Sequence, residues 1–183
     1  MERRNAWLSY TEAEEKELEQ VAKAYRNFLN VGKTERECVT QIIREARAAG
    51  YESLEEKTAK GEKLKAGDKV YTVGMKKIIA LFHIGQDDIS EGMNILGAHI
   101  DSPRIDVKQN PLYENEELAY LDTHYYGGIK KYQWVAQPLA LHGVIVKKNG
   151  ETVKVSIGED ENDPVFVITD LLVQLVIQSL GGL

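Results

Sequence analysis

An apolar run that ends in a His-x-Asp triplet is the feature that most constrains what this chain can fold into. Residues 93–100 are mostly apolar and carry His99 near their end, and Asp101 and Pro103 follow. The run predicts a strand over 93–100, and the proline predicts where the strand stops, because proline has no amide hydrogen to donate. Side chains two residues apart in a strand point to the same side, so His99 and Asp101 are expected to lie together at the end of a sheet.

The His-x-Asp triplet predicts metal-dependent hydrolysis. A carboxylate can hold one nitrogen of an imidazole while the other nitrogen binds a metal ion, which makes His99 the candidate ligand and Asp101 the carboxylate that orients it. The same spacing also occurs in purely structural pairs, in which a buried histidine is bonded to a carboxylate. One histidine is not a metal site, so further ligands are required.

The charge balance and the cysteine content exclude several classes of protein. The formal net charge is −6 at pH 7, which argues against binding to nucleic acid or to an anionic membrane surface. Cys38 is the only cysteine, so no internal disulfide can form, and we expect a reducing, cytoplasmic location. We also expect neither a secretory signal nor a membrane span, because no apolar run has the required position and length.

The first half of the chain predicts helices followed by short strands. Thr11 and Glu14 have capping-box spacing and start a helix that residues 30–32 break, and Thr34 starts a second helix that ends near Gly50. Residues 51–65 are charged and weakly patterned, as in a surface segment. Strands are predicted over residues 69–72, 77–84 and 93–100, with a turn at Gly74. Helices followed by strands indicate a layered α/β domain.

The pattern changes after Pro103 and becomes rich in predicted strands. Short strands are expected near Ile105 and Leu118, on either side of a polar loop. Alternation predicts a strand over 137–148, which Asn149-Gly150 connects through a two-residue hairpin turn to a return strand at 152–157. Residues 165–180 predict a strand that runs into a helix.

Other candidate groups have structural explanations. His83 ends a predicted strand, His124 lies in a run of aromatic residues that suits a pocket, an interface or a buried loop, and His142 is expected to face solvent or a subunit neighbour. Ser102 lacks the Gly-x-Ser-x-Gly context of a serine hydrolase. Residues 159–163 are acidic but lack the glycine and closing glutamate of a calcium loop, which favours a solvated loop.

Four segments follow one another along the chain: Gly-Ala-His-Ile-Asp-Ser-Pro-Arg (97–104), Tyr-Tyr-Gly-Gly-Ile-Lys-Lys-Tyr-Gln-Trp (125–134), Pro-Leu-Ala-Leu-His-Gly (138–143) and Ile-Thr-Asp-Leu-Leu (168–172). Together they resemble the M18 family of metalloaminopeptidases, of the aspartyl aminopeptidase type and its bacterial branch. The resemblance implies an α/β fold that contains part of a zinc-peptidase sandwich domain, with a β-rich dimerisation domain inserted after the His-x-Asp strand. It places the N-terminal part of the peptidase domain at residues 1–103 and part of the dimerisation domain at 104–183.

The resemblance also implies the chemistry. The family uses two zinc ions, bridged by an aspartate and a water, and a glutamate general base to release the N-terminal residue of a peptide; manganese and cobalt are alternative metals. His99 matches a terminal metal ligand, and Asp101 matches the carboxylate that orients it. The implied substrates are peptides, with acidic N-terminal residues as candidates. The implied assembly is a dimer-based homo-oligomer, often of twelve subunits.

The departures from the family pattern predict that this chain alone is inactive. The remaining ligands of the family lie downstream of Leu183, and Glu116-Glu117 is not at the position of the family's Glu-Glu pair. Gln174 stands near where the family commonly has a histidine, so no role transfers to it. The alternatives are a non-catalytic oligomerisation or regulatory fragment, and a metal site that subunits build together from His83, His99 or His124.

Overall fold

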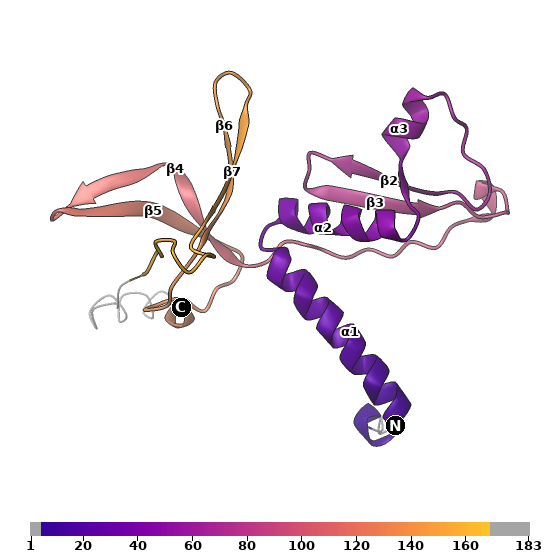
Figure 1. The fold of residues 1–183 in the computed structure, drawn as a ribbon, viewed down its shortest axis with the longest axis horizontal. Helices are drawn as coiled ribbons and strands as arrows, with labels where there is room; N and C mark the ends of the chain where they lie inside the picture. Colours follow the sequence, from indigo (N-terminus) through magenta and orange to yellow (C-terminus); the bar gives the residue numbers. More distant parts are fainter. Residues whose placement is uncertain (1–4, 169–183) are drawn as a thin grey trace. The chain divides into compact units, whose positions relative to one another are not determined.

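Two capped helices open the first half of the chain (Figure 1). The computed structural model describes residues 5–168. After a short 3-10 helix at Ala6–Leu8, α1 covers Glu12–Val31, and Thr11 and Glu14 form the predicted capping box at its start. α2 covers Glu35–Ala48, and the Thr34 side chain accepts a hydrogen bond from the Glu37 amide. Both predicted helix starts are confirmed, because each depends on hydrogen bonds between residues close in sequence.

The segment after α2 contains structure that the sequence pattern did not predict. Within residues 51–65, β1 covers Glu52–Ser53 and α3 covers Leu54–Ala59, where only an unpatterned surface segment was expected. The Ser53 side chain accepts a hydrogen bond from the Glu56 amide and so caps α3. β1 pairs in parallel with a strand that lies further along the chain, and this pairing cannot be seen in the local pattern.

A three-stranded sheet in the order β1-β2-β3 follows. β2 covers Lys69–Gly74 and runs antiparallel to β3, which covers Ile78–His83. Between them, Met75 and Lys76 have φ angles of 50° and 60°, and the Lys77 amide donates to the Gly74 carbonyl oxygen at 3.0 Å. The two predicted strands and the turn near Gly74 are therefore confirmed.

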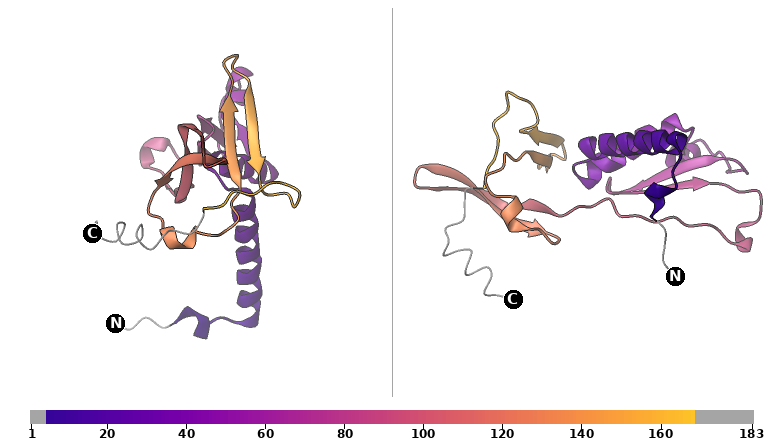
Figure 2. Two further views of the ribbon diagram at one scale, coloured as in Figure 1. Left: turned by 90° about the vertical axis from the view of Figure 1, so that its left-hand side faces the viewer. Right: turned by 90° about the horizontal axis from the view of Figure 1, so that it is seen from below.

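The core of this part of the molecule lies between α2 and β2. Figures 1 and 2 show α2 lying along the β2–β3 hairpin, whereas α1 extends away from the sheet. The buried apolar side chains are Cys38, Val39 and Ala46 of α2 and Val70 and Tyr71 of β2. No residue of α1 is buried, and most of its apolar side chains are exposed.

The strand predicted over residues 93–100 is wrong. A 3-10 helix covers Ile89–Glu91, and the chain then runs without regular structure to β4. Leu96 is 100% exposed and Ile95 is 80% exposed. An apolar run becomes a strand only when neighbouring strands accept its hydrogen bonds, and within residues 5–168 no strand pairs with this segment.

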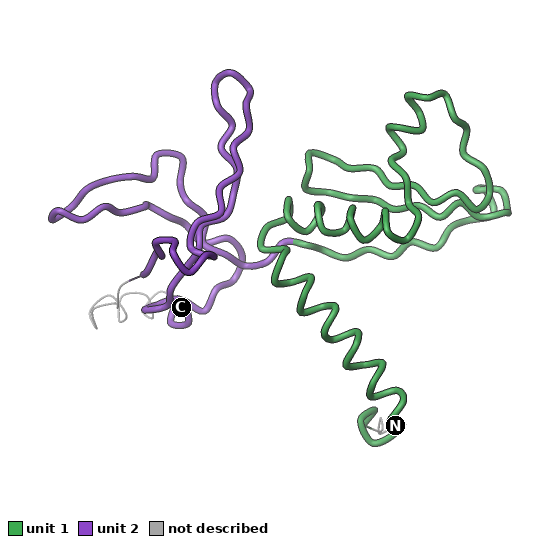
Figure 3. Tube along the Cα trace, viewed as in Figure 1, with its two compact units in different colours: residues 1–100 green, residues 101–183 purple. Residues whose placement is uncertain are grey.

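The chain divides into two compact units, Met1–Ile100 and Asp101–Leu183 (Figure 3). The second unit begins with β4 at Arg104–Asn115 and β5 at Leu118–Tyr126, which pair antiparallel with a shift in register between Val107 and Leu112. β4 therefore extends through most of the region predicted as a polar loop. The tip between the strands is Glu116-Glu117, whose φ angles are 51° and 66°.

A second hairpin consists of β6 at Leu141–Val146 and β7 at Thr152–Ile157. The hairpin is confirmed, but its turn is not the predicted two-residue Asn149-Gly150 turn. The Gly150 amide donates to the Lys147 carbonyl, the Lys147 amide donates to the Glu151 carbonyl, and only Gly150 in this turn has a positive φ. Three residues therefore connect the strands, with the glycine in the left-handed position.

Few side chains of the second unit are enclosed. A 3-10 helix covers Lys131–Gln133, and isolated bridges join Val135 to Ile168 and Leu139 to Phe166. No residue from 101 to 168 is buried. The strand and helix predicted over 165–180, and Gln174, lie largely or wholly outside the described residues. None of the described helices is long and apolar enough to cross a membrane.

Candidate functional site

Asp101 is held by a side chain that lies 25 residues further along the chain. The Tyr126 hydroxyl donates a hydrogen bond to Oδ2 of Asp101 at 2.9 Å. Tyr126 is the last residue of β5, and Asp101 lies just before the start of β4. The antiparallel pairing of β4 with β5 therefore brings the two side chains together.

Arg104 supports the tyrosine from above its ring. Its Cζ lies 4.2 Å from the centroid of the Tyr126 ring, within the range of a cation–π contact. Its Nε donates to Oδ1 of Asp106 at 2.7 Å, and both side chains of this ion pair are about three-quarters buried. Arg104 and Tyr126 are partners in the strand register, so the contact is a cross-strand pair.

The chain makes a close turn at the same end of this hairpin. Gly127 has a φ of 72°, and a Cβ at this position would lie 3.5 Å from Pro103. The glycine thus permits a left-handed backbone next to the proline that precedes β4. The arrangement places the ends of β4 and β5 beside Asp101.

His99 is an exposed residue in the segment without regular structure that precedes Asp101. It is the second-last residue of the first unit, and Asp101 is the first residue of the second. The pairing of this imidazole with this carboxylate therefore remains a prediction.

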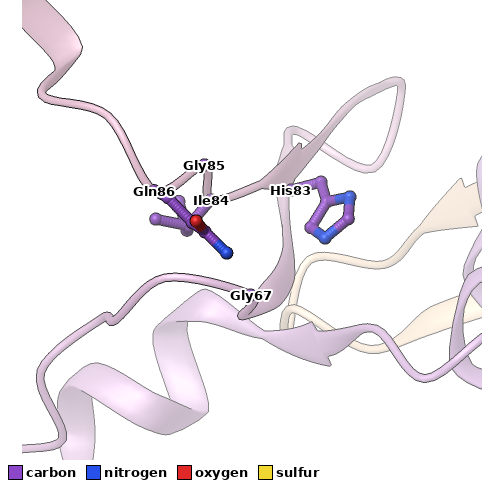
Figure 4. A pocket seen from close by; sticks show the side chains of 5 residues that line it. All are labelled: Gly67, His83, Ile84, Gly85 and Gln86. Atoms are coloured by element: carbon purple, nitrogen blue, oxygen red, sulfur yellow. The ribbon is translucent and has the colours of Figure 1, made fainter.

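The other three histidines lie at the end of β3, on β5 and on β6. His83 lines a small pocket with Gly67, Ile84, Gly85 and Gln86, none of which is a usual metal ligand (Figure 4). His124 is exposed on β5 and faces Asp106 in the register. His142 was expected to face solvent or a neighbouring subunit, but its side chain is only 12% exposed, and its Nε2 lies 2.9 Å from Oε1 of Glu159.

The described residues do not complete a zinc site. Between residues 5 and 168, no group of three or more His, Cys, Asp and Glu side chains could hold a metal ion. A zinc centre takes about three protein ligands or more. The donor types at His99 and Asp101 suit one ligand and its supporting carboxylate, and the other ligands are not found among these residues.

The comparison with protein families agrees with the motifs around Asp101. The sequence model of a family described as aminopeptidase I zinc metalloprotease (M18) matches residues 28–179. This match includes His99, Asp101 and the β4–β5 hairpin, and it covers most of both units. The chain belongs to this M18 family.

Relatives within the M18 family are similar over almost all of this chain. It is 55% identical over 179 residues to the probable M18 family aminopeptidase 1 of Clostridium acetobutylicum, a match that covers 98% of this chain and 38% of the relative. A second relative of the same name, from Thermotoga maritima, is 44% identical over 179 residues, which cover 96% of this chain and 37% of the relative. The chain thus spans well under half the length of these M18 proteins.

Solved M18 structures confirm the predicted α/β fold class. The crystal structure of aminopeptidase I from Borrelia burgdorferi matches with a TM-score of 0.84 at 42% identity, over 93% of this chain and 41% of that one. Aminopeptidase I from Clostridium acetobutylicum matches with a TM-score of 0.80 at 54% identity, over 97% and 39%.

Sequence reasoning missed the part that Tyr126 and Arg104 play at Asp101. Both residues stand inside the motifs that carry the M18 resemblance, yet nothing in their spacing connects them to the carboxylate. The contact depends on the register of β4 and β5, in which Arg104 faces Tyr126. The contact between Tyr126 and Asp101 could have been predicted only once the register of β4 against β5 was known.

Proposed function

We propose that this chain is the N-terminal portion of a zinc-dependent M18 aminopeptidase that releases N-terminal residues from peptides. The observation that carries the proposal is the family match over residues 28–179, a range that contains the His-x-Asp triplet. Acidic N-terminal residues are the first substrates to test. A cytoplasmic location agrees with the single cysteine.

In this proposal, His99 is a zinc ligand and Asp101 orients it. A carboxylate that accepts a hydrogen bond from one ring nitrogen fixes the tautomer and the direction of the other, which is the arrangement found around many zinc-bound histidines. Two zinc ions, or manganese or cobalt in their place, would supply a bound water of lowered pKa and would polarise the peptide carbonyl. The remaining ligands would come from the part of the relatives' length that this chain does not span.

The chain by itself would be inactive. Its described residues offer no cluster of three ligands, and one histidine does not retain zinc against competition from solvent. The expected behaviour of the purified chain is therefore a folded first unit without stoichiometric metal.

Uncovered apolar surface supports assembly into a homo-oligomer built from dimers, as in the twelve-subunit shells that the family resemblance implies. Val21 and Tyr25, one turn apart on α1, are 65% and 62% exposed. In the second unit, Leu112 is 73% exposed and Val146 is 65% exposed. Large apolar side chains that stay exposed are suited to interaction surfaces, because leaving them in water is unfavourable.

A second candidate is a non-catalytic scaffold that only self-associates. It is favoured by the exposed apolar side chains of the β4–β5 and β6–β7 hairpins, together with the lack of a ligand cluster among residues 5–168. It differs from the first proposal in assigning no metal chemistry to His99.

Metal analysis and peptidase assays on the purified chain separate these proposals from a complete enzyme. The chain is incubated with zinc, manganese or cobalt, and the release of N-terminal aspartate, glutamate and leucine from peptides is measured beside a His99→Ala variant. Both proteins should show no turnover and no stoichiometric metal. Turnover that disappears in His99→Ala would show that the chain itself holds a working centre.

The scaffold and the enzyme portion are distinguished by joining the chain to the rest of an M18 relative. A working hybrid whose activity requires His99 supports the enzyme portion. A hybrid that assembles and retains its activity without His99 supports the scaffold.

A further inference from the structure

The tyrosine that donates the hydrogen bond to Asp101 is itself held in place by Arg104 and Asp106. The tyrosine ring lies under the Arg104 guanidinium at 4.2 Å, and Asp106 accepts from Arg104 Nε at 2.7 Å. Each residue in this series restrains the next one. The series ends at Oδ2 of Asp101, which the tyrosine hydroxyl contacts at 2.9 Å.

We propose that Tyr126 is a positioning residue for the metal centre, and that its hydroxyl holds the Asp101 carboxylate in the orientation in which Asp101 orients His99. This inference rests on the proposed function, because it concerns the carboxylate that supports the ligand. Tyr126 itself contacts neither metal nor substrate in this account. It acts through Asp101.

The chemistry of a carboxylate explains why such support is needed. An ionised aspartate accepts hydrogen bonds at both oxygens, and the torsion that turns its carboxylate is broad. A donor fixed at Oδ2 restricts that torsion and so sets the direction of Oδ1. Loss of such outer contacts in metal sites costs about 10- to 100-fold in metal affinity or activity.

The position of Tyr126 at the end of β5 makes its contact with Asp101 depend on the pairing of β4 with β5. Asp101, Arg104 and Tyr126 all belong to the second unit, and the register of β4 against β5 brings the tyrosine to the carboxylate. A change that shifts the register of β4 against β5 would therefore disturb Asp101.

The neighbouring tyrosine provides a matched control. Tyr125 is the preceding residue of β5 and is 59% exposed, and its ring lies 5.3 Å from the Nζ of Lys131. Adjacent residues of a strand point to opposite faces. Tyr125→Phe therefore removes the same hydroxyl from the same strand on the opposite face.

The test measures the tautomer of His99 in the 183-residue chain by two-dimensional NMR of the imidazole nitrogens. Spectra are recorded above the pH at which the ring is protonated, and the His99→Gln variant identifies the His99 signals. Wild type should show one dominant tautomer, and Asp101→Asn should give a mixture. Tyr126→Phe should move the tautomer ratio at least half of the way to the Asp101→Asn value, and Tyr125→Phe should leave it unchanged.

The outcomes separate this inference from the proposed function. If Asp101→Asn changes the ratio and Tyr126→Phe does not, the positioning role is overturned and the pairing of His99 with Asp101 stands. If Asp101→Asn has no effect, the pairing itself fails, and the inference fails with it. A purely structural role for Tyr126 would change the amide signals of β4 and β5 without selecting a tautomer.

A second variant is needed if Tyr126→Phe unfolds the β4–β5 hairpin, which the loss of its amide signals would show. Arg104→Gln retains the tyrosine hydroxyl and removes the cation above the ring. It should move the tautomer ratio in the same direction by a smaller amount. No movement in a folded Arg104→Gln protein would contradict the support assigned to Arg104 and the series that ends at Asp101.

Discussion

The Sγ of Cys38 lies 3.5 Å from the carbonyl oxygen of Gly32, at the corner where α1 ends and α2 begins. A Cβ added to Gly32 would lie 2.8 Å from this sulfur and 3.2 Å from the Phe28 carbonyl oxygen. Gly32 has a φ of −93°, which any residue can adopt, so its role is to leave space and not to permit an unusual backbone.

Gly32→Ala should therefore lower the free energy of unfolding by about 1–3 kcal/mol, the usual cost of forcing an extra methyl into a packed site. Urea denaturation measures the change. Adding Cys38→Ala should recover part of the loss, since it removes one of the two colliding atoms. Gly85→Ala is the control, because nothing lies within 4 Å of its added Cβ. Equal losses for Gly32→Ala and Gly85→Ala would contradict the steric account.

The ammonium group of Lys57 makes the first unit sensitive to alkaline pH. The hydrogen bond that Lys57 Nζ donates to Oε2 of Glu52 at 2.7 Å is the main cause that raises the pKa of Lys57 above its ordinary value of 10.5, and the bond to Glu62 adds to it. A group whose pKa is higher in the folded state stabilises the fold fully below its unfolded pKa and loses this effect as pH rises through the folded pKa.

Lys57→Met should therefore be less stable than wild type at about pH 8, and the difference should shrink as pH rises above the ordinary lysine pKa. Thermal unfolding at a series of pH values measures this difference. Lys60→Met, at the C-terminal cap of the same helix, is the control for the loss of a lysine side chain as such. A Lys57→Met deficit that stays constant into strong alkali would exclude the charge as its cause.

The turn between β2 and β3 carries two side chains in a conformation that favours glycine and asparagine. Met75 and Lys76 have φ angles of 50° and 60°, and the double replacement Met75→Asn with Lys76→Gly should raise the free energy of unfolding by about 1 kcal/mol. Lys77→Gly, one position later and without a positive φ, should instead lower it. Urea denaturation of the two variants should thus give opposite signs.

Local signals were enough to predict α1 and α2 but not the segment that carries the candidate ligand. Thr11 and Thr34 cap their helices through residues three positions away, so the sequence contains the whole interaction. The strand expected over residues 93–100 needs partners from elsewhere, and among residues 5–168 none pairs with it. Its apolar pattern gave no information on whether those partners would be present.

The candidate site shows the same limit. His99 and Asp101 are adjacent enough in sequence to be chosen from a motif, whereas Tyr126 becomes a partner of Asp101 only through the register of β4 and β5. His142 illustrates the reverse case, since alternation suggested an outward side chain, whereas the side chain is only 12% exposed and contacts Glu159. Contacts between distant residues decide both cases, and no local pattern encodes them.

The central claim is that His99 and Asp101 belong to a zinc aminopeptidase centre that residues outside this chain complete. A hybrid tests it most directly, in which this chain replaces the matching portion, 38% of the length, of the Clostridium acetobutylicum relative. The measurement is peptide turnover by the zinc-loaded hybrid, beside its Asp101→Asn and His99→Ala variants.

The account predicts that the hybrid releases N-terminal residues, that Asp101→Asn lowers turnover by about 10- to 100-fold, and that His99→Ala abolishes it. A folded His99→Ala hybrid that binds zinc and turns over peptides as fast as the unmodified hybrid would contradict it.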